Sequence, residues 1–423
     1  MCERGTAGQE GGEPQPPVTL RGTSSTTQGL ACPFPLCCIN DVKKSNTDKT
    51  TPLTPPIVLA SAFAFESAEG MIEAARQPGQ GDLYSRWSNP TLEYVEDALR
   101  KLEGAERALL TASGMSAIHI ALMSALTHHK ATPGVLLVQN EIYGATHELV
   151  SHILEPLGIH VQRAPLTHLA KASRALPPRS VIYAEVPTNP LIRVADIKSV
   201  RESAPQDALV IVDATFASPV NVLALSLGAD LVVHSATKYL GGHHDLLAGV
   251  IAGNDTLMAH AWSMRKLFGP VLDPAAAYRL WRGLETLSLR VETQNASAAI
   301  LAERLSNHSK VEQVHYPTLL THPDHELAKR TMSGCGGVLS FEVKGGPDAA
   351  ARVINATTHI KRAASLGGVS TLITWPAGVT HVGLNDAERK ASGVRGGLLR
   401  LAIGVESVEV LWKELNQVLT EST

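Results

Sequence analysis

The sequence predicts an α/β protein with a mostly parallel sheet flanked by helices, followed by a smaller α/β C-terminal domain. From Leu102 onward, short apolar segments alternate with amphipathic segments, which is the pattern of strands connected by helices. A long helical pattern over residues 274–307 then leads to a second region with its own apolar segments. The chain has 423 residues, which is enough for two domains and a sizeable core.

Six apolar segments are predicted to form the larger sheet, because short apolar runs bounded by turn residues are typical of buried strands. In chain order they are RALLTAS at 107–113, GVLLVQ at 134–139, SVIYAEV at 180–186, ALVIVDA at 208–214, LVVHSA at 231–236 and GVIAG at 249–253. Two later segments are predicted to belong to the smaller domain, namely GVLSFEVKG at 337–345 and LLRLAIGV at 398–405.

The first fifty residues are rich in Gly, Pro, Ser, Thr and Gln and show no periodicity, which is typical of disorder. We therefore predict a disordered tail over 1–50, an N-terminal arm over 51–67, a large domain over 68–270 and a C-terminal domain over 271–423. Four of the five cysteines lie in the tail, and this distribution argues against a disulfide-stapled fold and fits a reducing, cytoplasmic compartment. They are Cys2, Cys32, Cys37 and Cys38, whereas Cys335 lies in the body.

Composition excludes two classes of partner. The formal net charge is −3 and 18% of the residues are charged, so the chain has no basic field that would attract nucleic acid. No apolar run approaches the length of a membrane span. The sequence therefore predicts a protein that binds neither nucleic acid nor a membrane.

The segment LVVHSATKYLGGHHDLLAGVIAG, residues 231–253, places Lys238 directly after an apolar β-branched run and among hydroxyl residues. A lysine held near a carbonyl cofactor in a partly dry pocket can exist as a Schiff base, and pyridoxal 5'-phosphate is the usual partner. Ser235 and Thr237 would offer two hydroxyl donors to its phosphate. The alternative is a surface lysine after an edge strand.

The strand ALVIVDA ends in Asp213, at the carboxyl edge of the predicted sheet, where ligands bind in such folds. A carboxylate there can pair with the protonated pyridine nitrogen and keep the ring an electron sink. Alternatively, Asp213 only caps the following turn. Because Lys238 and Asp213 occur together, the sequence predicts a pyridoxal-phosphate site.

These residues resemble the γ-subgroup of fold-type I pyridoxal-phosphate enzymes, the Cys/Met metabolism or trans-sulfuration family. The resemblance extends from about Thr51 to the C-terminus and rests on nine separated motifs in the family's order. They are TPPI at 54–57, YSRWSNPT at 84–91, LEGAERALLTASGM at 102–115, YGAT at 143–146, EVPTNPLIRVADI at 185–197, VDATFASP at 212–219, HSATKYLGGH at 234–243, SLGG at 365–368 and LLRLAIGVE at 398–406. The resemblance implies the fold-type I architecture and an enzyme.

The resemblance implies how the phosphate is held. Gly114 and Met115 would open a helix and give it backbone N–H groups, in agreement with the affinity of helix N-termini for anions. Ser235 and Thr237 would complete this shell.

Tyr84 and Arg86 resemble the pair that reaches the phosphate of the neighbouring subunit's cofactor. The resemblance therefore implies a homo-oligomer, a tetramer, with shared active sites. The alternative is that both residues belong to a polar surface loop.

Four further residues receive roles from the resemblance. Tyr143 would stack on the cofactor ring and exchange a proton with the substrate or leaving group, or else it is a buried structural tyrosine. Asn189 would hydrogen-bond the phenolic oxygen of the cofactor. Arg400 would bind the α-carboxylate of an amino-acid substrate, with Ser365 beside it, since its planar fork suits a carboxylate. Alternatively, Arg400 is a strand-edge arginine paired with an acid.

The implied reaction occurs at the substrate Cγ. Leu83 and Ala364 stand where cystathionine γ-lyases carry glutamates, so the distal pocket is less charged and favours a short neutral tail. We predict γ-elimination that breaks the Cγ–S bond of cystathionine or a methionine-like substrate. Ala145, in place of the cysteine of methionine γ-lyases, leaves the substrate open. The alternatives are γ-replacement on an O-acylated homoserine, or a protein that binds the cofactor without turnover.

Histidines do not indicate a metal. His243, His244 and Asp245 are adjacent in the chain, and adjacent side chains do not easily converge on one ion. His243 and Asp245 instead fit the GHxD turn of the family. No metal site is predicted.

Overall fold

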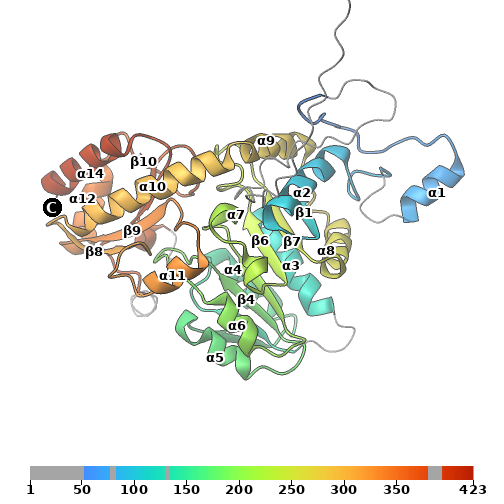
Figure 1. Cartoon of the computed structure of the whole chain (residues 1–423), viewed down its shortest axis with the longest axis horizontal. Coiled ribbons are helices and arrows are strands. Elements are labelled where there is room, and N and C mark those ends of the chain that lie inside the picture. The colour runs from blue at the N-terminus through green and yellow to red at the C-terminus, as the bar shows by residue number, and fades with distance from the viewer. Residues whose placement is uncertain (1–51, 77–81, 129–133, 380–392, 423) are drawn as a thin grey trace, which may run out of the picture. The chain divides into compact units, whose positions relative to one another are not determined.

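The computed structural model of the protein describes residues 52–76, 82–128, 134–379 and 393–422. Its strands form a seven-stranded sheet and a five-stranded sheet (Figure 1). The predicted class, a mostly parallel sheet flanked by helices with a smaller α/β region after it, is confirmed. The predicted tail and its cysteines Cys2, Cys32, Cys37 and Cys38 lie outside the described residues.

The larger sheet has the strand order β1-β7-β6-β5-β4-β2-β3. Strands β3, β2, β4, β5 and β6 are parallel neighbours, whereas β7 runs antiparallel to both β6 and β1. All six predicted strands are present. Strand β3 was not predicted, because its middle residues are exposed and polar. The bounds are β1 Arg107–Thr111, β2 Leu136–Gln139, β3 Val161–Ala164, β4 Val181–Glu185, β5 Leu209–Asp213, β6 Leu231–Ser235 and β7 Gly249–Gly253.

Helices cover both faces of this sheet, which explains why its central strands are continuously apolar. Helices α3 and α8 pack with alternate strand residues on one face, and α2, α5 and α6 pack on the other. The helices of this region are α1 Ala68–Arg76, α2 Pro90–Glu103, α3 Gly114–His128, α4 Gly144–Leu149, the π-helix η2 Val150–Leu154, the short helix η3 Leu166–His168, α5 Leu169–Arg174, α6 Ile197–Ser203, α7 Ser218–Asn221, η4 Ala224–Leu227 and α8 Asp255–Phe268.

The smaller sheet has the order β10-β11-β12-β9-β8. Figure 1 shows α10, α12 and α14 gathered on one side of it, and these helices pack on β8, β9 and β12 and on one another. The bounds are α10 Leu287–Ser306, β8 Val311–His315, α11 His325–Thr331, β9 Val338–Val343, α12 Gly346–Ala356, β10 Lys361–Arg362, β11 Leu372–Thr374, η5 Pro376–Gly378, β12 Leu398–Ala402 and α14 Val408–Ser422.

The long helical pattern over 274–307 forms two helices and not one. The segment forms α9, Pro274–Leu284, and α10, which are separated by Glu285 and Thr286. The carbonyl of Gly283 accepts hydrogen bonds from the Arg290 side chain at 2.6 Å and from the Thr286 backbone at 3.3 Å. Because these donors replace the partner that a continuing helix would supply, α9 ends here.

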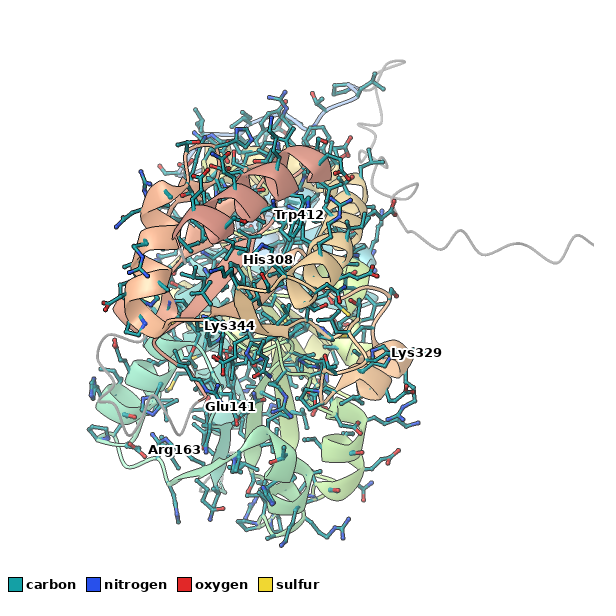
Figure 2. The ribbon with its side chains drawn as sticks, turned by 90° about the vertical axis from the view of Figure 1, so that its left-hand side faces the viewer. Glu141, Arg163, His308, Lys329, Lys344 and Trp412 are labelled. Carbon is teal, nitrogen blue, oxygen red and sulfur yellow. The ribbon has the colours of Figure 1, made fainter. Side chains whose placement is uncertain are left out.

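The C-terminal helix α14 is anchored on α10 by aromatic and charged contacts. Trp412 of α14 and His308 lie with their ring centroids 6.2 Å apart (Figure 2). The guanidinium of Arg304 lies 5.8 Å from the Trp412 ring and pairs with Glu409. None of the helices in the described ranges has the length and apolarity needed to cross a bilayer.

The part of the N-terminal arm that the structure describes is extended and lies along the segment that follows Leu83. Ala62 forms a β-bridge with Tyr84, and the side chain of Asn89 donates to the Val58 carbonyl at 2.9 Å. In return, the Val58 N–H donates to the hydroxyl of Thr91 at 2.8 Å. The arm therefore holds the turn that contains Tyr84 and Arg86.

A bidentate ion pair fastens the connection after β4 to the loop before α11. Arg193 donates to both carboxylate oxygens of Asp324 at 2.6 and 3.0 Å, and Asp324 also accepts the Val194 N–H. We expect Asp324→Asn to lower the free energy of unfolding by about 2 kcal/mol, because it removes the charge from a partly buried bidentate pair. Urea denaturation measures this loss. Glu409→Gln, which breaks a solvent-exposed pair, is the control and should leave the urea midpoint almost unchanged; equal losses in both variants would contradict the interpretation.

Candidate active site

Lys238 lies in the turn that follows β6. Its Nζ donates to Ser365 Oγ at 3.0 Å, although the two residues are far apart in the sequence. Burial, with a smaller contribution from the nearby positive charge of Arg400, lowers the pKa of Lys238 to about 8. A larger fraction of this amine is therefore neutral, and so nucleophilic, than in an ordinary lysine.

The Lys238 turn is fixed by the segment Ser365–Val369. The Val369 N–H donates to the Gly242 carbonyl at 3.0 Å. At Gly367, which has φ +74°, a Cβ atom would lie 2.6 Å from the Tyr239 nitrogen, so no other residue fits without displacing the turn. The SLGG motif therefore fixes the Lys238 turn, because its backbone lies in close contact with Tyr239, the residue next to Lys238.

Asp213 lies at the end of β5, buried beside Glu185 at the end of β4. The two residues are directly paired in the parallel register. Asp213 accepts from the Thr215 N–H at 2.9 Å and from the Tyr183 hydroxyl at 3.3 Å, both neutral donors. Burial raises the pKa of Asp213, and burial together with the charge of Asp213 raises the pKa of Glu185 well above its usual range. A cationic ligand atom beside Asp213 would relieve this cost, which suits a protonated pyridine nitrogen.

The N-terminus of α3 meets the end of β6. A Cβ atom added to Gly114 would lie 2.7 Å from Ser235 Cβ, so the glycine permits this close approach. Met115 follows in the first turn of the helix. The first N–H groups of α3 and the Ser235 hydroxyl therefore lie together, an arrangement that is suited to an anion such as a phosphate group.

Thr237 lies two residues beyond Ser235. Its hydroxyl accepts the Ala248 N–H at 3.0 Å. The hydroxyl in turn donates to the Ala248 carbonyl at 3.3 Å, so both bonds fix the side chain on the same turn that carries Lys238.

Arg400 is buried in β12, which lies between β11 and β9, so the alternative of a strand-edge arginine is wrong. Its Nη1 donates to Asn189 Oδ1 at 2.8 Å and its Nη2 donates to the Ser365 carbonyl at 3.0 Å. Within the described residues its Nε has no hydrogen-bond partner. Burial lowers the pKa of Arg400 to about 10. A buried guanidinium bonded to neutral groups favours an anionic ligand such as a carboxylate.

Tyr143 begins α4 and is 47% exposed, so the alternative of a buried structural tyrosine is wrong. Its N–H donates to Glu185 Oε1 at 2.6 Å. The hydrogen bond attaches the backbone of Tyr143 to the buried carboxyl pair. Its ring remains accessible to a ligand.

Tyr84 and Arg86 lie in an exposed turn. Arg86 Nη1 donates to the Lys266 carbonyl at 2.7 Å, and its guanidinium lies 5.5 Å from the Tyr84 ring. Their contacts run to α8 and the N-terminal arm, not to the residues around Lys238. Their role toward a neighbouring subunit remains a prediction.

Sequence reasoning did not identify Tyr183, Glu185 and Thr215 as site residues. Glu185 opens the EVPTNP motif and ends a predicted strand. The missing information was the pairing of β4 with β5, which places Glu185 beside Asp213. Strand order depends on long-range packing and is not written in either segment alone.

The model of the family described as Cys/Met metabolism PLP-dependent enzyme matches residues 38–420. The chain belongs to this family. The family predicted from the motifs is therefore confirmed, and with it the pyridoxal-phosphate cofactor and membership among the trans-sulfuration γ-lyases and γ-synthases. This family relationship supports small amino acids as the substrate class.

Relatives with several activities resemble the chain about equally. Cystathionine gamma-synthase 1, chloroplastic, of Arabidopsis thaliana is 38% identical over 88% of this chain, which spans 66% of that enzyme's length. L-methionine gamma-lyase of Pseudomonas putida is 38% identical over 88% of this chain and 93% of the relative. O-succinylhomoserine sulfhydrylase of Pseudomonas aeruginosa is 39% identical over 83% of this chain and 87% of the relative.

A solved structure shares the fold. Cystathionine gamma synthase from Xanthomonas oryzae pv. oryzae, in complex with cystathionine, matches with a TM-score of 0.79 and 36% identity, covering 88% of this chain and 93% of that chain. The predicted fold-type I architecture is confirmed.

The Glu185 hydrogen bond can be tested by two substitutions. Because the pKa of Glu185 is raised well above its usual range, the protonated carboxyl resembles an amide. We expect Glu185→Gln, which keeps an oxygen for the Tyr143 N–H, to retain kcat/KM within about threefold, and Glu185→Ala to lose about tenfold or more. Steady-state kinetics measure both variants, and their melting temperatures control for folding. Equal losses would show that the charge of Glu185, and not its hydrogen bond, is required.

The lowered pKa of Lys238 predicts how cofactor attachment depends on pH. Since only the neutral amine attacks an aldehyde, the rate of attachment to the cofactor-free protein should rise about tenfold per pH unit below about pH 8 and level off above it. The growth of visible absorbance after mixing with excess pyridoxal phosphate measures the rate. N-acetyl-lysine is the control and should continue to rise to about pH 10. The same rise in the protein above pH 9 would contradict the lowered pKa.

Proposed function

We propose that the protein uses pyridoxal phosphate to eliminate a sulfur substituent from Cγ of an amino acid, releasing an α-keto acid and ammonia. One observation carries this proposal. Lys238 Nζ and the guanidinium of Arg400 both bond to Ser365, at 3.0 Å each. A base and an anchor for the substrate carboxylate therefore meet on one residue, so a substrate held by Arg400 presents its Cα near Lys238.

The residues of the site fit the cofactor. Lys238 would carry it and Asp213 would lie opposite its pyridine nitrogen. The phosphate would rest on the first N–H groups of α3, at Gly114 and Met115, with the hydroxyls of Ser235 and Thr237 beside them.

Asn189 uses its Oδ1 to accept from Arg400, which leaves its Nδ2 to donate to the phenolic oxygen of the cofactor. The ring of Tyr143 would stack on the cofactor. Both residues would thereby link the cofactor to the substrate-binding side of the site.

When bound, pyridoxal phosphate supplies an electron-withdrawing ring that stabilises negative charge at the substrate Cα. Arg400 holds the α-carboxylate. Lys238, once released by the substrate amine, would remove the Cα proton and then act at Cβ, since a large fraction of its amine is neutral near pH 8. Tyr143 Oη gives a proton to the departing sulfur.

The distal pocket favours a substrate with a short uncharged tail. Neither Leu83, which is half-buried, nor Ala364, which is exposed, has a carboxylate that could bind a distal ammonium. Binding that ammonium without a counter-charge would cost up to a few kcal/mol in a dry site. We propose a methionine-like substrate ahead of cystathionine.

The second candidate is γ-replacement on an O-acylated homoserine. It is favoured by the similarity to cystathionine gamma-synthases and to O-succinylhomoserine sulfhydrylase. Both reactions use the same proton transfers at Cα and Cβ. They differ in whether a thiol captures the product of Cγ cleavage.

We also propose a cytoplasmic homotetramer in which Tyr84 and Arg86 of one subunit bind the phosphate in the next. The exposure of both side chains supports this arrangement. Arg86 donates one N–H to the Lys266 carbonyl, and its other N–H groups can donate to a phosphate. The free, buried Cys335 fits a reducing compartment.

A product assay by mass spectrometry tests the reaction. The protein, loaded with pyridoxal phosphate, is given methionine, cystathionine or an O-acylated homoserine, each with and without cysteine. We expect keto acid and ammonia from methionine without added thiol, and no product from Lys238→Ala, since that variant loses the base. A thioether formed only from acylated homoserine and cysteine would establish γ-replacement instead. No product from any substrate would show a binding protein.

A further inference from the structure

The C-terminal turn of α8 packs against the turn Tyr84–Trp87. Trp87 closes this turn, since its N–H donates to the Tyr84 carbonyl at 2.7 Å. Trp87 belongs to the YSRWSNPT motif, yet the reaction described above gives it no role. Its contacts indicate what it does.

Helix α8 holds Trp87 through both backbone and ring. Trp262 Nε1 donates to the Trp87 carbonyl at 2.8 Å, and Arg265 Nη2 donates to the same oxygen at 3.2 Å. The Trp87 and Trp262 rings lie edge to face, with centroids 6.2 Å apart and planes at 88°. This geometry is favourable for aromatic pairs.

Lys266 completes the cluster with a cation. Its Nζ lies 4.7 Å from the centroid of the Trp87 ring and 4.8 Å from that of Trp262, within cation–π range of both. Its carbonyl accepts from Arg86 Nη1 at 2.7 Å. Lys266 therefore holds the ring of Trp87 by its charge and the guanidinium of Arg86 by its backbone.

The same end of α8 is fixed to the strand that precedes α3. Arg265 is buried, donates to the Leu110 carbonyl of β1 at 2.9 Å and pairs with Glu96 at 2.7 Å. Beyond the helix, the Pro270 carbonyl accepts the Ala112 N–H at 2.9 Å. The turn that carries Arg86 is thus attached to the segment that leads into the α3 anion site.

We infer that Trp87, Trp262 and Lys266 form a cation–π clamp that presents Arg86 to a phosphate group of the cofactor. The three are positioning residues, since they act through Arg86. An exposed arginine loses rotamer freedom when it binds, and fixing its turn beforehand reduces that loss. The inference rests on the proposed role of Arg86 in the neighbouring subunit's site.

The test measures the dissociation constant of pyridoxal phosphate from the full-length protein by absorbance titration. Lys266→Met keeps the backbone carbonyl and the length of the side chain but removes the cation. We expect it to raise the dissociation constant about tenfold while kcat at saturating cofactor changes less than twofold. Lys266→Arg should restore affinity to within about threefold, because it restores the cation. Lys198→Met, which removes an exposed lysine from α6, is the matched control and should leave the constant unchanged.

The variant Arg86→Ala distinguishes a failure of the clamp from a failure of the proposed sharing of active sites between subunits. We expect it to weaken cofactor binding, and we expect Lys266→Met to add no further loss in the Arg86→Ala background, because coupled residues are not additive. A full additional tenfold loss there would overturn the inference, as would an unchanged constant in Lys266→Met alone. If Arg86→Ala itself leaves the constant unchanged, the proposed sharing of sites fails too.

A second variant excludes a folding defect as the cause of weaker cofactor binding. If Lys266→Met lowers the melting temperature of the cofactor-free protein, Trp87→Phe replaces it, since phenylalanine keeps an aromatic ring and the backbone carbonyl. We expect a rise of about threefold in the dissociation constant, because phenylalanine attracts a cation less strongly than tryptophan. No rise would overturn the inference.

Discussion

The contact between the Lys238 turn and the segment Ser365–Val369 is the constraint on which the candidate site depends. Lys238 follows a strand of the larger sheet, whereas Ser365 and Arg400 belong to the region of the smaller one. The Lys238–Ser365 hydrogen bond and the Gly242–Val369 backbone bond join these regions. Neither sheet alone places a nucleophilic amine beside a buried guanidinium. The site therefore requires both, and any displacement between them would separate the base from the carboxylate anchor.

The titratable groups around this contact are buried, and burial disfavours the charged form of each of them. Burial raises the pKa values of Asp213 and Glu185 and lowers those of Lys238 and Arg400. A buried charge is stabilised only by a partner of opposite sign or by strong hydrogen bonds. Under the proposed function, pyridoxal phosphate and an amino acid would together supply the complementary groups, namely a pyridinium for Asp213 and a carboxylate for Arg400. Ligand binding should thus stabilise the folded protein as well as assemble the reacting groups.

The sequence was informative where local patterns determine structure. Six of the seven strands of the larger sheet, the helix that begins at Gly114 and the turn after β6 are recognisable from apolar runs and the residues that end them, whereas β3 is not. The break between α9 and α10 was not, because it depends on Arg290 reaching the Gly283 carbonyl. The pairing of Glu185 with Asp213 and the packing of Lys266 on Trp87 are likewise contacts between distant segments. The predicted roles of Arg400 and Tyr84 came from the family resemblance, because no local pattern distinguishes these residues from other polar residues.

The absence of a carboxylate at Leu83 and Ala364 could be offset by another acid, and Glu406, just after β12, is the nearest candidate in sequence to Arg400. Its two oxygens are already engaged, one by the Thr371 N–H and the other by the Thr371 hydroxyl, each at 2.7 Å. The hydroxyl in turn accepts the Gly404 N–H at 2.9 Å. Turning Glu406 toward a substrate ammonium would break these bonds, which tie the segment Gly367–Thr371 to the end of β12, and would leave the Thr371 N–H without its acceptor. Glu406 therefore contributes to the fold and not to substrate charge recognition, and among the acids near the site that the structure describes, the exposed Glu148 of α4 remains the one that could offer a carboxylate to a substrate.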